Sequence, residues 1–133
     1  MSEPAVIREL KFCDPALVMK RAAGLPQCLF LDSAGGRTRL GRYAYVMADP
    51  YRMVKSKNGS IIVDGKQVEG DPFQLLKSLL AEERLETVAG LPPFQGGAAG
   101  LFSYDLAWDL ERLPTHQEDD LAFPDMAVGF YDT

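Results

Sequence analysis

Two turn dipeptides constrain the fold of this chain more than any other feature. Within YRMVKSKNGSIIVDGKQVEG (residues 51–70), Asn58-Gly59 and Asp64-Gly65 separate short runs that contain alternating apolar side chains. Both dipeptides tolerate the positive φ angles that a tight hairpin turn requires. The spacing therefore predicts three consecutive antiparallel strands, over residues 51–57, 60–65 and 66–70.

Two Asp-Pro pairs predict where helices begin. Asp14-Pro15 and Asp71-Pro72 each place a capping carboxylate directly before a proline, the residue best suited to the first helical position. The first pair predicts a short helix over 14–24. The second begins an apolar stripe with helical spacing and predicts an amphipathic helix over 71–84.

Other apolar runs complete the predicted architecture. Leucine spacing favours a further helix, and the remaining runs predict four strands, at 5–10, 27–33 (largely buried), 42–49 and 121–132. A chain of 133 residues fits one domain. The predicted fold is therefore α+β: mainly antiparallel β-sheet with two or three packed helices, the third over 106–113. The last strand reaches the C-terminus without a turn or polar tail, which predicts that residues 1–133 are one domain of a longer protein.

Charge and composition exclude several classes of partner. The chain carries 14 basic and 19 acidic residues, a net charge of −5. Nucleic acid and anionic membranes both require a basic face, so neither is expected as the main partner. No targeting segment or apolar membrane span is visible. Cys13 and Cys28 match no metal or redox motif, which predicts reduced, half-buried thiols in a cytoplasmic protein.

The glycine-rich stretch QGGAAGLFSYDL (residues 95–106) does not fit a phosphate-binding loop. No lysine follows Gly100, as a P-loop requires, and the glycines miss the dinucleotide-binding spacing. We therefore expect Gly96, Gly97 and Gly100 to permit close packing of a neighbouring backbone or sheet.

No catalytic constellation emerges from the residues. His116 lies in a polar loop and the acidic run 118–120 is typical of a solvated surface, so neither a Ser-His-Asp triad nor a metal site is predicted. Four aromatic residues are expected in the core rather than on a stacking platform: Phe94, Phe102, Tyr104 and Trp108. A small-ligand pocket is plausible where the strand ending at Ser33 meets the start of the next strand at Arg42 and Tyr43.

Three segments together resemble a known family. LFLDSAGGRTRLGRYAYVMADPYR, PPFQGGAAGLFSYDLAWDLERLP and LAFPDMAVGFYD are similar to the N-terminal region of the chorismate-utilising component I enzymes, anthranilate synthase component I and aminodeoxychorismate synthase component I. The LDS motif stands where anthranilate synthases commonly have Leu-Glu-Ser. With PDMAVGFYD, it looks more like the aminodeoxychorismate enzyme, on the route from chorismate to p-aminobenzoate and folate.

The resemblance implies a division of labour. Chorismate and magnesium bind in a C-terminal catalytic domain that this chain lacks, and ammonia comes from a glutamine amidotransferase partner. The chain itself would hold no catalytic residue, metal or cofactor and would be inactive alone. It would carry part of a tryptophan-type effector pocket, at the positions that match the family motif: Ser33, Leu40, Gly41, Arg42 and Tyr43.

Two alternatives stay open. The product of the full enzyme could be anthranilate, on the route to tryptophan. The chain could also be a free-standing amino-acid-binding module with no part in an enzyme.

Overall fold

The computed structural model describes residues 6–33, 39–83, 86–112, 119 and 121–132. His116, Glu118 and Asp120, weighed above as catalytic or metal-binding candidates, lie outside these residues. The elements follow the order α1 (Pro15–Ala22), β1 (Leu29–Asp32), β2 (Ala44–Met47), β3 (Arg52–Lys57), β4 (Ser60–Val63), β5 (Lys66–Val68), α2 (Pro72–Glu82), β6 (Gly97–Phe102), the 3-10 helix η1 (Tyr104–Asp109) and β7 (Met126–Tyr131).

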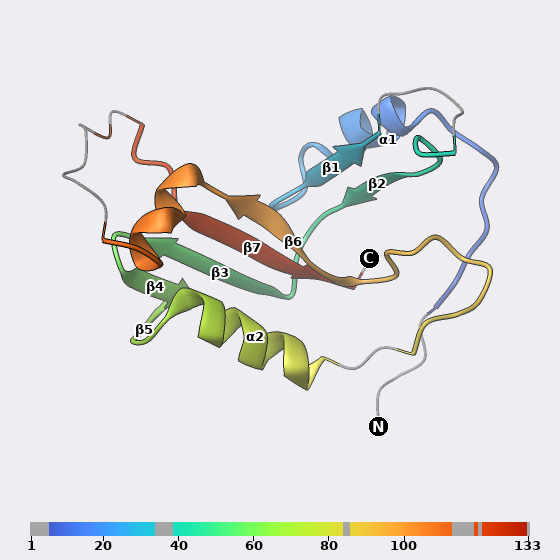
Figure 1. Ribbon diagram of the computed structural model, residues 1–133. Helices are drawn as coiled ribbons and strands as arrows, with labels where there is room; N and C mark the ends of the chain where they lie inside the picture. Colours follow the sequence, from blue (N-terminus) through green and yellow to red (C-terminus); the bar gives the residue numbers. More distant parts are fainter. Residues whose placement is uncertain (1–5, 34–38, 84–85, 113–118, 120, 133) are drawn as a thin grey trace.

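The strands form two separate antiparallel sheets. The larger has five strands in the order β5-β4-β3-β7-β6, and the smaller consists of β1 and β2. In Figure 1 the small sheet, with α1 beside it, lies beyond one end of the large one. The predicted α+β class, with mainly antiparallel sheet, is confirmed.

The two turn dipeptides and the two Asp-Pro caps form the local structures that they predict. Asn58 and Asp64 both adopt a φ of 49°, and the glycines that follow them are also positive, so both hairpin turns form where the dipeptides predict. Asp14 accepts a hydrogen bond from the backbone N–H of Ala16 (2.8 Å), and Asp71 accepts one from Gln74 (2.7 Å). These caps begin α1 and α2 at the predicted residues.

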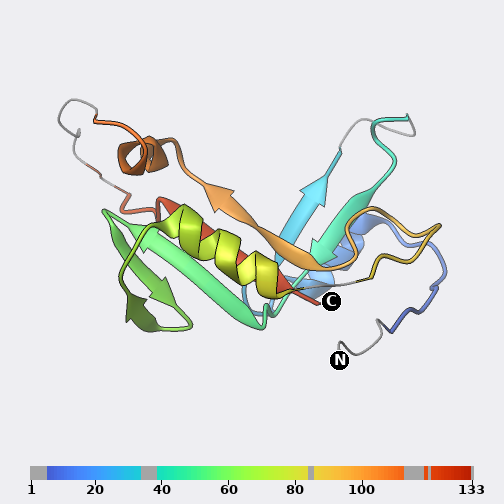
Figure 2. The same cartoon turned by 60° about the horizontal axis from the view of Figure 1, so that its bottom comes forward.

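The core lies on one face of the five-stranded sheet. Residues directly opposite each other in neighbouring strands share a face, so Val54 and Val128 point the same way. Helix α2 crosses this face, as Figure 2 shows, and contributes Leu76, while η1 contributes Leu106. The buried cluster comprises Val54, Ile61, Leu76, Leu106, Met126, Val128 and Phe130.

A single phenol joins the two sheets. Tyr131, at the end of β7, is 3% exposed and donates a hydrogen bond from its hydroxyl to the carbonyl of Gln27, just before β1 (2.9 Å). Burial raises the pKa of this phenol. The small sheet is therefore held to the large one by a buried polar contact.

The glycine-rich stretch contains β6, and its glycines meet different structural requirements. A Cβ at Gly100 would meet the carbonyl oxygen of Ala127 and would lie 2.7 Å from Val128 Cα, so the expected close approach is confirmed there. At Gly97 the nearest atom would be Phe94 Cε2 at 3.8 Å, which is ordinary contact. Close packing is therefore the wrong reason for Gly97, whose φ of 127° explains the glycine instead. Gly96 likewise has a positive φ, of 113°.

Several predictions about elements are wrong. Residues 6–10 form no strand, although one was predicted over 5–10. The expected helix over 106–113 is the shorter η1, which begins at Tyr104. β1 is only half-buried, because α1 covers a single face of a two-stranded sheet.

Burial also differs from expectation at some side chains. Cys13 is exposed, whereas Cys28 is half-buried with its Sγ 3.5 Å from the Sδ of Met19. Phe102 and Tyr104 are 50% and 92% exposed, so the prediction that they lie in the core is wrong. Within the described part of the chain, no helix is long and apolar enough to cross a membrane.

Candidate functional site

The predicted pocket residues lie where β1 ends and β2 begins. Asp32 pairs with Ala44, so the antiparallel register places Ser33 opposite Tyr43. The Ser33 hydroxyl donates a hydrogen bond to the backbone carbonyl of Tyr43 (3.0 Å). The guanidinium of Arg42 lies 5.1 Å from the centre of the Tyr43 ring. The structure thus brings three of the five predicted residues together.

The other two predicted residues lie in the loop before β2. Leu40 is 92% exposed, and Gly41 occupies a bend just before β2. Most of the loop between Ser33 and these residues, at positions 34–38, lies outside the described residues. Leu40 therefore forms no wall of a pocket within the described part of the chain.

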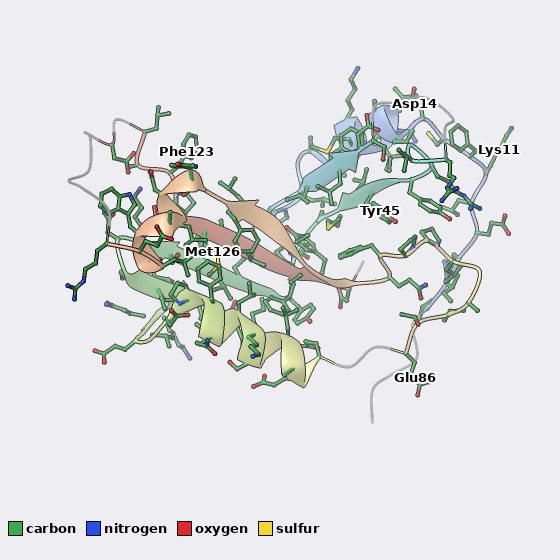
Figure 3. The ribbon with its side chains drawn as sticks, viewed as in Figure 1. Lys11, Asp14, Tyr45, Glu86, Phe123 and Met126 are labelled. Carbon is green, nitrogen blue, oxygen red and sulfur yellow. The ribbon has the colours of Figure 1, made fainter. Side chains whose placement is uncertain are left out.

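A row of aromatic rings continues from Tyr43 along β2. The ring centres of Tyr43 and Tyr45 are 6.3 Å apart, and those of Tyr45 and Phe94 are 5.7 Å apart in an edge-to-face arrangement. Residues two apart in a strand share a face, so Tyr43, Tyr45 and Met47 line one side of β2. Figure 3 shows Tyr45 on the side of β2 away from α1.

Helix α1 occupies the opposite side of the small sheet. Cys28 continues the register of β1 and therefore shares a face with Val46 rather than with Tyr45. Its contact with Met19 of α1 places the helix on the Val46 side. The aromatic row is consequently left free of α1.

A cavity of about 300 Å³ adjoins this row. It opens between β2 and the segment that leads into β6, and it is lined by Ala44, Tyr45, Val46, Met47, Phe94, Gln95, Gly96 and Asp132. The Gln95 amide is engaged elsewhere: it accepts from the Val88 N–H (2.8 Å) and donates to the carbonyls of Val88 (3.0 Å) and Pro92 (3.1 Å). These bonds close the loop from Val88 to Gln95 on itself, and the ring contact with Tyr45 places Phe94 beside β2.

The chemistry of these residues suits binding rather than catalysis. Aromatic and apolar walls can enclose a flat apolar group, and the Asp132 carboxylate supplies negative charge. The Ser33 hydroxyl donates a hydrogen bond to the backbone carbonyl of Tyr43, so the oxygen lone pairs of Ser33 remain able to accept a hydrogen bond from a ligand ammonium. Among the described residues, no group of three or more His, Cys, Asp or Glu side chains could hold a metal ion.

None of the eight residues that line the cavity was among the predicted site residues. Tyr45 and Met47 could have been found from the two-residue period that starts at Tyr43. Phe94 and Asp132 could not, because they reach β2 only through the pairing of β6 with β7 and the path of the preceding loop.

Comparison with known proteins places these observations in a wider context. A scan against protein-family models finds no match. Anthranilate synthase component 1 of Acetivibrio thermocellus is 33% identical over 123 residues, which cover 89% of this chain and 25% of that protein. Aminodeoxychorismate synthase component 1 of Escherichia coli (strain K12) is 35% identical over 135 residues, which cover 97% of this chain and 30% of that protein.

A solved structure is also similar. Anthranilate synthase component I from Streptococcus pneumoniae TIGR4 aligns with a TM-score of 0.56 and 28% sequence identity, over 64% of this chain and 19% of that one. The chain spans less than a third of the length of the curated relatives described above.

Proposed function

The chain is related to the component I proteins of anthranilate synthase and aminodeoxychorismate synthase, and on that premise we propose that it is the N-terminal scaffold and effector-binding domain of an aminodeoxychorismate synthase component I. The complete protein would aminate chorismate with ammonia from a glutamine amidotransferase partner, in the cytoplasm, on the route to p-aminobenzoate and folate. The match to the Escherichia coli aminodeoxychorismate enzyme, which covers 97% of the chain, supports this choice of product.

In this proposal the chemistry takes place outside the chain. The comparisons cover less than a third of each curated relative, which leaves room for a catalytic domain that binds chorismate and magnesium. The acidic residues described in this chain form no cluster suited to a metal. We therefore expect residues 1–133 to be inactive when isolated.

The effector domain would bind an aromatic amino acid such as tryptophan. The indole ring of tryptophan would lie against the row of Tyr43, Tyr45 and Phe94. The α-ammonium of the amino acid would donate hydrogen bonds to the Ser33 hydroxyl and the Tyr43 carbonyl. The observation that carries this proposal is the aromatic row, which leads from the Ser33–Tyr43 contact to the cavity.

Titration of the chain with L-tryptophan, followed by NMR, tests the pocket. Because the site is open, binding is expected to be weak, with a Kd on the order of 1 mM or above. Shifts should be confined to residues 33, 43–47 and 94–96, and Tyr45→Leu should abolish them. Leu40→Ala is the matched control, because this side chain is exposed and should leave binding unchanged. Chemical shift changes that persist in Tyr45→Leu, or the absence of local shift changes, would contradict the proposed tryptophan pocket.

Affinity also separates this domain from a free-standing binding module. A module with a complete site should bind in the micromolar range, about −8 kcal/mol. Such tight binding by the isolated chain would favour the module over a domain that shares its pocket with a catalytic part.

An anthranilate synthase is the second candidate for the complete protein. The structural similarity to the Streptococcus pneumoniae anthranilate synthase component favours it. Incubating the protein encoded by the complete reading frame with chorismate and ammonia distinguishes the two, since the proposal predicts aminodeoxychorismate. Accumulation of anthranilate would overturn the choice of pathway and leave the tryptophan site untouched.

A further inference from the structure

The two outer edges of the five-stranded sheet differ in how they are protected. At one edge, β5 has only three residues and begins with Lys66. Short edge strands and edge lysines prevent unwanted pairing with other strands. At the other edge, β6 has six residues, GAAGLF, with no charged side chain and no proline. The β6 sequence therefore lacks the short length and the charged side chain that protect the β5 edge.

The backbone groups at the open edge follow from the register of β6 with β7. The Ser103 N–H donates to the Asp125 carbonyl (2.8 Å), which continues the pairing of Gly97 with Tyr131. In an antiparallel pair, residues alternate between those that bond the partner strand and those that point away. Three residues of β6 therefore direct their N–H and C=O groups outward: Ala98, Gly100 and Phe102. Within the described residues, no strand pairs with that side of β6.

Apolar side chains surround the end of this edge. Leu101 is 48% exposed, Phe102 50%, Tyr104 92% and Phe123 62%. The Ser103–Asp125 hydrogen bond holds the segment after β6 beside the start of β7, and Figure 3 shows Phe123 close to η1. Exposed apolar side chains beside an unpaired edge favour pairing with a further strand.

We propose that the open edge of β6 pairs with a strand from the remainder of a longer component I polypeptide, which extends the five-stranded sheet by one strand. This inference rests on the proposed function, because it takes the chain to be one domain of such a protein. A longer polypeptide offers the source of this strand, because the matched parts leave about 70% or more of each curated relative outside this chain. An uncharged edge with exposed apolar side chains suits a strand that is held there permanently.

The added strand would lie close to the candidate pocket. β6 begins directly after Phe94, Gln95 and Gly96, which line the cavity beside β2. Pairing at the β6 edge would therefore connect the effector-binding residues to the rest of the polypeptide through three consecutive residues. This gives ligand binding a physical route to the remainder of the protein.

Amide hydrogen exchange tests the proposal on the polypeptide encoded by the complete reading frame, compared with residues 1–133. The amides of Ala98, Gly100 and Phe102 should exchange rapidly in the 133-residue chain and about 100-fold more slowly in the longer one. The amide of Gln67, in the β5 edge strand, is the internal control and should not change. Phe102→Pro should abolish the new protection of Ala98 and Gly100, since proline removes an outward N–H without costing a bond to β7. Phe102→Ala, which loses the ring and keeps the N–H, should retain it.

Each other outcome overturns the proposal. Equal exchange in both polypeptides would show that the edge stays unpaired, and a reading frame that ends at Thr133 would remove the source of the strand. Protection that rises with the concentration of the 133-residue chain alone would assign the edge to a second copy. The tryptophan titration and the product assay do not depend on β6 pairing, so a failure here is distinguishable from a failure of the proposed function.

Discussion

The five-stranded sheet and the two-stranded sheet bury very different amounts of apolar surface. The large sheet, with α2 and η1, contains the whole buried cluster, from Val54 to Phe130. In the small sheet with α1, Met47 is the one hydrophobic residue that is fully buried among those described, and α1 has none. A two-stranded sheet is only marginally stable by itself. The large sheet therefore stabilises the fold, and the small sheet presents the aromatic row.

The largest expected effect comes from removing a core side chain of the large sheet. Phe130 is fully buried, so Phe130→Ala should lower the free energy of unfolding by about 3–5 kcal/mol. Leu31 of β1 is 46% exposed, and Leu31→Ala should cost less than about 1 kcal/mol. Urea denaturation measures both. Similar losses at the two positions would contradict the difference between the sheets.

Glycine substitutions in β6 test how tightly the large sheet is packed. Gly100→Ala forces a Cβ against the backbone of β7 and should cost about 1–3 kcal/mol. Gly97→Val should cost a similar amount, because its positive φ strains a side chain even though the space is open. Thermal unfolding of both variants is the measurement. A neutral Gly100→Ala would show that β6 can move away from β7 without loss.

The two helix caps offer a matched comparison of the two regions. Asp14 and Asp71 both precede proline and accept a backbone hydrogen bond of similar length. Asp71→Ala should lower the free energy of global unfolding by about 1 kcal/mol, because α2 packs on the core. Asp14→Ala should leave global unfolding almost unchanged, since α1 can open locally. Equal effects in urea denaturation would mean that α1 unfolds with the core.

The smallest effect is a pH dependence at the large sheet. Burial, with the nearby Asp125 and Asp71 carboxylates, raises the pKa of Asp109. A raised folded-state pKa favours the protonated form on folding, so the stability contribution is full below the ordinary Asp range and is lost as pH rises through the folded pKa. Asp109→Asn should therefore stabilise the protein slightly at pH 7, with a gain that disappears below about pH 4.

Urea denaturation of Asp109→Asn and of the unchanged protein as a function of pH is the measurement. If Asp109→Asn lowered stability at pH 7, the carboxylate would have a favourable partner and the argument from burial would fail.

The sequence predicts local structure well where one or two residues determine the backbone. The turns at Asn58 and Asp64 and the caps at Asp14 and Asp71 depend only on their own side chains and neighbours. Residues 6–10 include the β-branched Val6 and Ile7, which favour a strand, but a strand also needs a partner, and none of the described strands pairs with them. Local pattern carries no information about which partner is present.

The candidate site was predictable in part for the same reason. Ser33 and Tyr43 face each other because their strands are joined by one loop, so a strand-end pocket could be expected there. The contact of Tyr45 with Phe94 joins residues that are far apart in the chain. It depends on how the two sheets are placed, which periodicity does not determine.

Amide exchange of the 133-residue chain with and without L-tryptophan distinguishes the roles of the two sheets. Without ligand, amides of β1 and β2 should exchange through local openings of lower free energy than those of β3 and β7, which should exchange through global unfolding. Saturating tryptophan should slow exchange in β1, β2 and residues 94–96, because their local openings disrupt the binding residues. It should slow the globally exchanging amides of β3 and β7 by no more than the factor that binding to the folded state imposes on global unfolding, which is one plus the ratio of the free ligand concentration to Kd. Equal opening free energies in both sheets without ligand, or no ligand protection in β1, β2 and residues 94–96, would contradict the division between a stabilising sheet and a binding sheet.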